Sequence, residues 1–145
     1  MSQQIDSDSY RIGRLVQRLY RAVERETSEQ RGGFGVSAAE HTVMGLIQPE
    51  GRLSVPQIAM RYRVSRQHVQ ATVNSLAEKG LVEAVDNPVH KRSPLIRLTH
   101  KGCEVLGALQ QRESAAMDHL FASMPAGERT QAREILDRLV RSLPS

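Results

Sequence analysis

The chain has 145 residues, of which 39% are hydrophobic and 25% charged, a composition that is typical of a folded globular domain and excludes a disordered chain. No stretch approaches the ~18 apolar residues of a membrane span, and the N-terminus lacks the apolar run of a secretory signal, so we expect a cytoplasmic protein with no membrane partner. Residues 61–101 carry a formal charge of +5 within a net charge of +4, which indicates one localised surface for phosphate groups.

An amphipathic helix is predicted over about Tyr10 to Gln30, because apolar side chains recur there every three or four residues. The glycines within Arg31–Gly35 are expected to end this helix, since they supply the left-handed conformations of a helix stop. Ser37 and Glu40 then form a capping-box pattern, which predicts the start of a second helix.

A short helix and a longer one are predicted next. Ser54 and Gln57 form another capping-box pattern, which indicates where the short helix begins. The longer helix is predicted over Ser65 to Lys79, with Ser65 as its N-cap and Gly80 as its left-handed end. Its inward face is expected to be Val69, Val73 and Leu76, and its outward face Arg66, Gln67, Gln70 and Asn74.

Two short segments rich in branched side chains, Leu81–Val85 and Leu95–Leu98, predict a pair of antiparallel strands. Pro88 and Pro94 suit a hairpin connection better than a central strand, so the residues between the two segments are expected to form a stiffened loop. The tip of this loop is basic, with His90, Lys91 and Arg92 in succession.

Two further helices are predicted after the hairpin. Thr99 is expected to cap the first, and the second follows a break at Met124–Glu128. The order of elements, with a basic hairpin after three helices, is that of a winged helix-turn-helix flanked by one leading and two trailing helices. The predicted fold class is therefore mainly α with a small β-hairpin wing (α+β), in a single compact domain.

From about Tyr10 to Leu143 the chain resembles the MarR family of regulators. The more specific parts of the resemblance are SVPQIAMRYRVSRQHVQATVNSLAEKGLVEAV (Ser54–Val85), similar to the family's helix-turn-helix and first wing strand, and KRSPLIRLTHKG (Lys91–Gly102), similar to its second wing strand and following helix start. The resemblance implies an obligate homodimer, a pseudo-palindromic DNA operator, and often release by a small-molecule effector or an oxidant. It also implies an Asp before the basic pair of the wing, where this chain has His90.

The first helix and the last two carry apolar stripes beyond what a helix-turn-helix core needs. We therefore expect residues 1–36 and 103–145 to be dimerisation helices around a DNA-binding lobe at residues 37–102. The residues expected at the dimer interface are Ile12, Leu15, Leu19, Ile135, Leu136 and Leu139.

The helix over residues 65–79 is the expected reader of the major groove, because Arg matches guanine, and Gln or Asn matches adenine, at two edge groups of each base. Its expected contacts are Ser65, Arg66, Gln67, His68, Gln70 and Asn74. The wing over residues 86–94 is expected in the minor groove, through His90, Lys91 and Arg92. Phosphate contacts are expected at Arg52, Ser54, Arg61 and Arg63, of which Ser54 also has a sufficient role as a helix cap.

Two functions of different classes remain open. One is a homodimeric, sequence-specific DNA-binding transcriptional regulator, which in the family it resembles is more often a repressor. The alternative is a winged-helix module that binds protein and no specific DNA; the localised charge and the amide-rich helix face argue against it. We find no catalytic constellation, so an enzyme is not expected.

Cys103 is the one cysteine of the chain, which excludes an intrachain disulfide and a clustered cysteine metal site. It is either an oxidant sensor or an inert, buried thiol, the more common state of a lone cysteine. The histidines form no recognisable metal set with neighbouring acids, so neither a metal nor another cofactor is expected.

Overall fold

Helix caps fix the starts of most helices at the positions that the sequence predicts. The structure is a computed structural model that describes residues 7–144. The carboxylate of Glu40 and the amide of Gln57 also accept the N–H of their own N-cap residue, so both predicted capping boxes are closed. The predicted N-cap residues whose side chains accept a hydrogen bond from the backbone N–H three residues later are Ser37, Ser54, Ser65 and Thr99.

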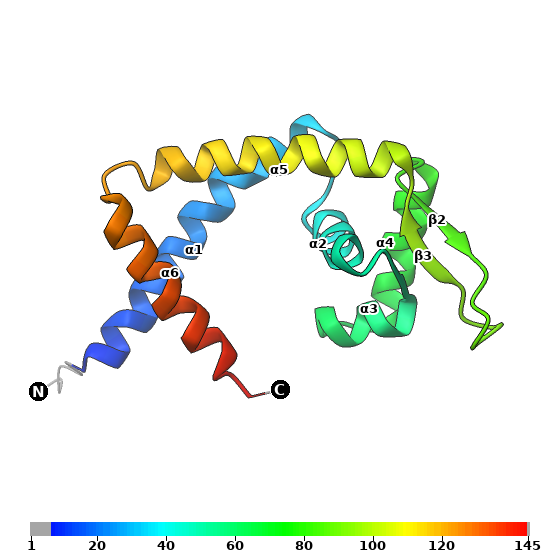
Figure 1. Cartoon of the computed structure of the whole chain (residues 1–145), viewed down its shortest axis with the longest axis horizontal. Coiled ribbons are helices and arrows are strands. Elements are labelled where there is room, and N and C mark those ends of the chain that lie inside the picture. The colour runs from blue at the N-terminus through cyan, green and yellow to red at the C-terminus, as the bar shows by residue number, and fades with distance from the viewer. Residues whose placement is uncertain (1–6, 145) are drawn as a thin grey trace, which may run out of the picture.

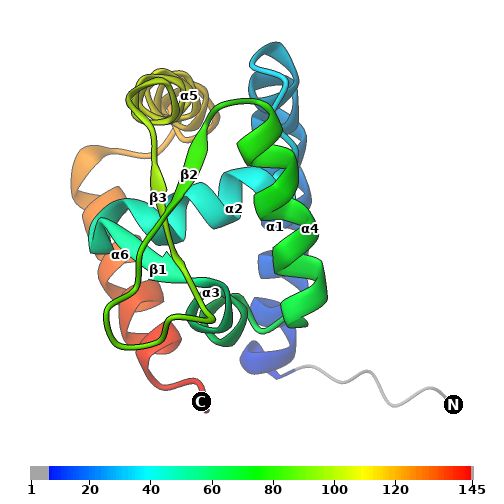
Figure 2. The same ribbon diagram turned by 90° about the vertical axis from the view of Figure 1, so that its right-hand side faces the viewer.

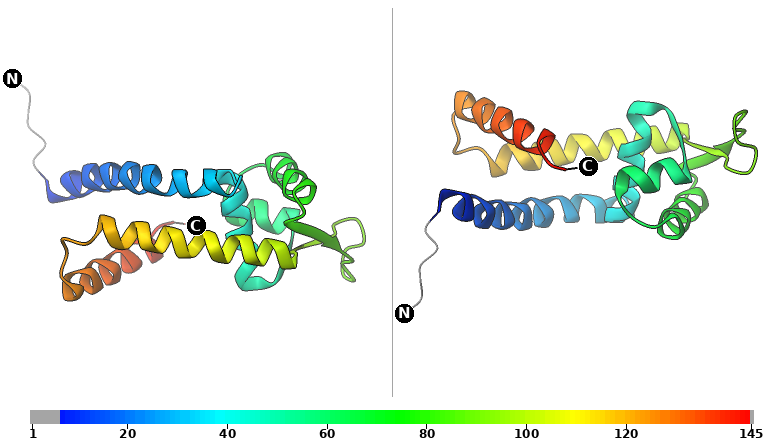
Figure 3. Two further views of the ribbon diagram at one scale, coloured as in Figure 1. Left: turned by 90° about the horizontal axis from the view of Figure 1, so that it is seen from above. Right: turned by 90° about the horizontal axis from the view of Figure 1, so that it is seen from below.

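Three helices form an arm beside a lobe (Figure 1). The first helix, α1 (Asp8–Gly33), packs against α5 (His100–Leu120), and both extend away from the lobe. Seen from above and below, α6 (Ala126–Arg141) turns back along the arm after the end of α5 (Figure 3). Within residues 7–144, no helix has both the length and the apolar character that crossing a bilayer requires.

The lobe contains three α-helices and a small sheet. Its elements are α2 (Ala38–Ile47), the 3-10 helix η1 (Gln48–Glu50), β1 (Arg52–Ser54), α3 (Val55–Tyr62), α4 (Arg66–Glu78), β2 (Val82–Val85) and β3 (Leu95–Leu98). The strands are antiparallel in the order β1-β3-β2, and Ile96 of β3 lies opposite Leu53 on one side and Ala84 on the other. The predicted hairpin is confirmed as β2 and β3, and β1 is a third strand that the sequence pattern does not predict. The three residues of β1 are too few to show an alternating pattern, and pairing with β3 makes them a strand.

The terminal helices differ slightly from their predicted bounds. The first helix starts at Asp8 because Ser7 caps it. It continues through the paired glycines of the predicted stop, and the left-handed residue is Gly35, with φ of 65°. The last helix begins at Ala126, within the segment 124–128 that the sequence predicts as a break.

The hydrophobic core fills the lobe and ends where the arm begins. The predicted inward face of α4 is confirmed, since Val69, Val73 and Leu76 are all buried. On α5, Leu106 and Leu109 are fully buried, whereas Met117 and Leu120 near its end, and Phe121 directly after it, are half-buried. Because burial of one such side chain contributes about 1.5–3 kcal/mol, most of the hydrophobic stabilisation of the described chain resides in the lobe.

Candidate nucleic-acid interface

The second helix of the helix-turn-helix, α4, presents one polar face to solvent. Ser65 caps the helix by accepting the N–H of His68 at 3.1 Å. Val69, Val73 and Leu76 hold the opposite face in the core, which fixes the rotation of the helix. As a result, every predicted base-contacting residue is exposed: Ser65, Arg66, Gln67, His68, Gln70 and Asn74.

Two amides on this exposed face are bonded to each other. Gln70 Nε2 donates to Asn74 Oδ1 at 2.9 Å, one helical turn further on. The bond uses one of the two Nε2 hydrogens, so the other hydrogen and Oε1 of Gln70 remain for the edge of a base. Such a pair of groups matches adenine, which presents an acceptor and a donor in the major groove.

The wing loop between β2 and β3 forms a tight turn at its basic tip. Ser93 N–H donates to the His90 carbonyl at 3.0 Å, which makes Lys91 and Arg92 the two central residues of a β-turn. All three predicted wing residues, including His90, are exposed. Figure 2 faces the end of the molecule where this loop, the start of α3 and α4 come together.

A cavity of about 330 Å³ lies between α4 and the wing. It brings together Arg66, Gln67 and Gln70 from α4 and Arg92 from the wing, four residues that the sequence predicts as DNA contacts. The lining is completed by Val55, Pro56, Ser93 and Pro94. The other predicted residues of α4 and of the wing do not line this cavity, although they are exposed.

The basic residues of the segment 61–101 divide into paired and unpaired groups. Five of the eight Lys and Arg side chains bind a group of the chain itself, as Arg97 does with Glu83 at 2.7 Å. The remaining three make no hydrogen bond or ion pair within residues 7–144, and they are Arg66, Lys91 and Arg92. The unpaired positive charge of this segment therefore lies on α4 and on the tip of the wing.

The four predicted phosphate contacts have different surroundings. Ser54 is 6% exposed and its hydroxyl accepts the N–H of Gln57, so the structure gives it the role of a helix cap. Arg61 pairs with Glu50 at 3.0 Å. The guanidinium of Arg63 donates to the Pro144 carbonyl at 3.2 Å, from a left-handed backbone with φ of 58°. The fourth residue, Arg52, is exposed on β1.

A buried carboxylate, Glu40, ties the end of α4 to the start of α2. It accepts hydrogen bonds from Lys79 Nζ at 2.7 and 2.9 Å, Ser75 Oγ at 2.7 Å and Ser37 N–H at 3.0 Å. Burial raises the pKa of Glu40, but the hydrogen bonds from Lys79, Ser75 and Ser37 outweigh it, so this pKa lies below its usual value. The sequence predicts only the capping bond, because the other two partners are far away along the chain.

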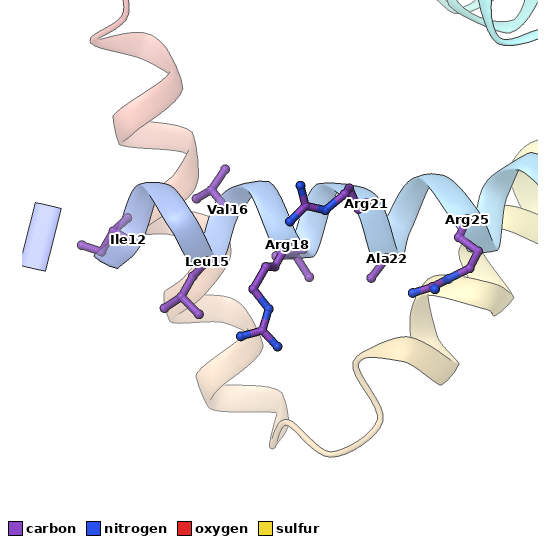
Figure 4. A pocket seen from close by; sticks show the side chains of 8 residues that line it. Ile12, Leu15, Val16, Arg18, Arg21, Ala22 and Arg25 are labelled. Carbon is purple, nitrogen blue, oxygen red and sulfur yellow. The ribbon is translucent and has the colours of Figure 1, made fainter. Parts of the chain in front are cut away.

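The arm exposes the apolar residues that the sequence assigns to a dimer interface. Ile12, Leu15, Leu19, Ile135, Leu136 and Leu139 are between 39% and 58% exposed. A cavity of about 830 Å³ follows α1, where Ile12, Leu15 and Val16 lie beside three arginines (Figure 4). A second cavity, of about 500 Å³, lies between Leu19 of α1 and Leu136 of α6.

The remaining candidate residues form no further site. Cys103 is exposed on α5, so it is not the buried thiol that a lone cysteine more often is. Within residues 7–144, no three His, Cys, Asp or Glu side chains lie together in a way that holds a metal ion.

Residues 34–93 match the model of the MarR family, and this segment runs from the end of α1 through the lobe to the wing loop. Over this segment the chain is similar to the MarR family. This family and its fold are those of helix-turn-helix transcriptional regulators and not of enzymes.

Two mycobacterial proteins are similar to this chain. The uncharacterized protein Rv2011c of Mycobacterium tuberculosis is 37% identical over 91 residues, which are 63% of this chain and 64% of the relative. The match thus spans less than two thirds of that relative's length. The uncharacterized HTH-type transcriptional regulator Mb0904 of Mycobacterium bovis is 24% identical over 139 residues, which are 94% of each chain.

Solved structures of MarR-family proteins share the fold. A MarR family protein from Bacillus stearothermophilus has a TM-score of 0.84 at 15% identity, over 97% of this chain and 96% of that one. A mutant of MarR from E. coli, complexed with operator DNA, has a TM-score of 0.79 at 21% identity, over 98% of this chain and 100% of that one.

Proposed function

We propose that this chain is a homodimeric, sequence-specific DNA-binding transcriptional repressor. It reads the major groove with α4 and the minor groove with the wing. The observation that carries the proposal is that Arg66, Gln70 and Arg92 meet at one cavity, where the unpaired basic charge of residues 61–101 also lies. The operator complex of an E. coli MarR mutant with the same fold supports DNA as the partner.

In this proposal the N-terminal half of α4 contacts bases, because a recognition helix enters the major groove with that half foremost. Ser65, Arg66, Gln67 and His68 belong to this half, and Gln70 and Asn74 follow one turn apart. Arg92 enters the minor groove, with Lys91 and His90 at the adjacent backbone. Arg52, Arg61 and Arg63 contact phosphates, and Arg61 exchanges Glu50 for a phosphate when it does so.

The test is duplex binding at a series of salt concentrations, with an operator obtained by selection from random DNA. Arg92→Ala should weaken binding and lower the slope of log K against log salt by about one, because one charged contact is lost. Arg138→Ala, an exposed arginine on α6, is the matched control and should change neither quantity. Wild-type affinity in Arg92→Ala would refute the minor-groove role of the wing.

The alternative function, a winged-helix module that binds protein, predicts a different result in the same assay. Such a module would bind neither the selected operator nor random duplex DNA at low salt. The sign of regulation needs a separate measurement, with a reporter gene placed behind the selected operator. Expression should rise when the regulator is removed, and a fall would make the protein an activator.

Dimerisation is proposed from the unpartnered apolar faces of α1 and α6. The six predicted interface residues are exposed although they are large and apolar, and two cavities lie along the same surface. A twofold dimer through this face would present two α4 helices to one DNA duplex, with half-sites about one helical turn (~34 Å) apart.

A further inference from the structure

One side chain, Asn87, closes the loop of the wing. Its Nδ2 donates to the Ser93 carbonyl at 2.9 Å, and its Oδ1 accepts the backbone N–H groups of Val89 at 3.1 Å and His90 at 3.4 Å. Asn87 and Ser93 are half-buried, whereas residues 88–92 between them are exposed. The side-chain amide of Asn87 therefore links the two ends of a loop whose other residues are exposed to solvent. We call its three hydrogen bonds, to Val89, His90 and Ser93, the clamp.

The clamp holds both ends of the turn that carries the basic pair. The β-turn runs from His90 to Ser93, with Lys91 and Arg92 at its centre. Asn87 binds the N–H of the first residue of this turn and the carbonyl of the last. Neither end of the turn can move away without losing a hydrogen bond to this one amide.

We propose that Asn87 is a positioning residue for DNA binding, which sets the place of Arg92 relative to α4 before DNA arrives. The inference rests on the proposed function of the wing and adds a residue that acts through Lys91 and Arg92. Ordering a flexible loop on binding costs conformational entropy, and a loop that is already ordered avoids this cost. Arg92 lines the cavity shared with Arg66 and Gln70, so a fixed turn also fixes the register between wing and helix.

The first experiment compares the operator affinity of the variants and its dependence on salt. Asn87→Ala should weaken binding on the order of tenfold, because up to three hydrogen bonds of the clamp are lost. The slope against salt should stay at the wild-type value, since no phosphate contact disappears. Arg92→Ala should give a different result from Asn87→Ala, because it lowers the slope of log K against log salt as well as the affinity.

The second experiment measures the mobility of the wing loop in the absence of DNA. Backbone order parameters of Lys91 and Arg92 from ¹⁵N relaxation should be about 0.8 in the wild type and fall toward about 0.6 in Asn87→Ala. Val89→Ala is the matched control for this experiment, since Val89 takes part in the clamp only through its backbone N–H, which alanine retains. Its order parameters should equal those of the wild type.

Together, the two experiments distinguish a failure of the positioning role from a failure of the clamp or of the proposed function. A loosened turn with unchanged operator affinity would overturn the positioning role, and a turn that stays ordered in Asn87→Ala would overturn the clamp. A slope that falls by about one in Asn87→Ala would mean that Lys91 or Arg92 loses its charged contact outright, and it would overturn pre-ordering of the turn as the source of the affinity. If the wild type itself fails to bind duplex DNA, the proposed function is wrong, and the positioning role falls with it.

Discussion

Gly102 lies directly against the backbone of Leu81, where the first turn of α5 meets the link between α4 and β2. A Cβ at position 102 would collide with the carbonyl oxygen of Leu81 and come within 2.9 Å of its carbonyl carbon. Thr99 N–H donates to the same carbonyl at 3.0 Å, and Thr99 Oγ1 donates to the Gly80 carbonyl at 2.6 Å. These contacts attach the lobe that carries α4 to the long helix of the arm.

Gly102→Ala should therefore lower the free energy of unfolding by about 3 kcal/mol, because the added methyl group meets backbone that cannot turn aside. Urea denaturation followed by circular dichroism measures the change. Gly107→Ala on the same helix is the control, since a Cβ there meets nothing within 4 Å. Alanine is also more favourable than glycine inside a helix, by about 1 kcal/mol. Equal stability of Gly102→Ala and the wild type would contradict the close contact.

Glu40→Gln should destabilise the protein by about 1–3 kcal/mol at neutral pH, because Lys79 loses its charged partner and the buried acceptor becomes neutral. The folded-state pKa of Glu40 is lowered, so its contribution is complete above the unfolded-state pKa and is lost as pH falls through the folded-state pKa. The difference between wild type and variant should thus be largest near pH 7 and shrink below about pH 4.

Urea denaturation at several pH values checks this expectation. Glu104→Gln is the matched control, because Glu104 pairs with His100 on the surface, at 67% and 91% exposure, and such pairs contribute less than about 1 kcal/mol. A stability difference for Glu40→Gln that does not depend on pH would show that the carboxylate is not the source of the effect.

The parts of the fold that were predicted correctly are those with local signals. Ser37, Ser54, Ser65 and Thr99 bond to groups three residues away, so a short stretch of sequence contains both partners. The inward face of α4 follows from helical spacing alone. Strand β1 was missed because its three residues take strand geometry from a partner more than forty residues further on.

The same distinction holds for the candidate site. Charge and amide content single out α4 and the tip of the wing, because both are properties of the residues themselves. The meeting of Arg92 with Arg66 and Gln70 depends on how the hairpin packs beside α4 through β2, and no local pattern contains it. Asn87 has a local signal, because Asn before a turn favours side-chain hydrogen bonds to nearby backbone N–H groups, as the structure has at Val89 and His90. Its bond to the Ser93 carbonyl depends on how the loop closes.

Replacement of one apolar residue on the arm should disrupt the proposed dimer. Leu15→Asp places a charge in the exposed stripe of α1, where desolvation by a second copy would be costly, and should shift the protein to monomer. Sedimentation equilibrium measures the change. Met60→Asp is the control, because Met60 is 73% exposed but belongs to α3, away from the arm. A Leu15→Asp protein that remains dimeric would place the interface elsewhere.

Gln70→Ala should alter the sequence preference of the protein at one base pair, by about 1–3 kcal/mol, without changing the slope against salt. The amide carries no charge, so its loss affects base discrimination and leaves the phosphate contacts intact. Operator selection with both proteins identifies the affected position, and titration of duplexes that differ only there gives the magnitude. Arg66→Ala provides the contrast, since it removes an unpaired charge from the same face.

Asn74→Ala should weaken the preference at the same base pair as Gln70→Ala, because Gln70 then loses the acceptor that orients its amide. The double variant should lose no more preference than Gln70→Ala alone, so the two changes are not additive. Titration of the same duplexes with all four proteins completes the cycle. If the losses add, Asn74 contacts DNA independently of Gln70, and the bond of 2.9 Å between the two amides does not organise the reading face.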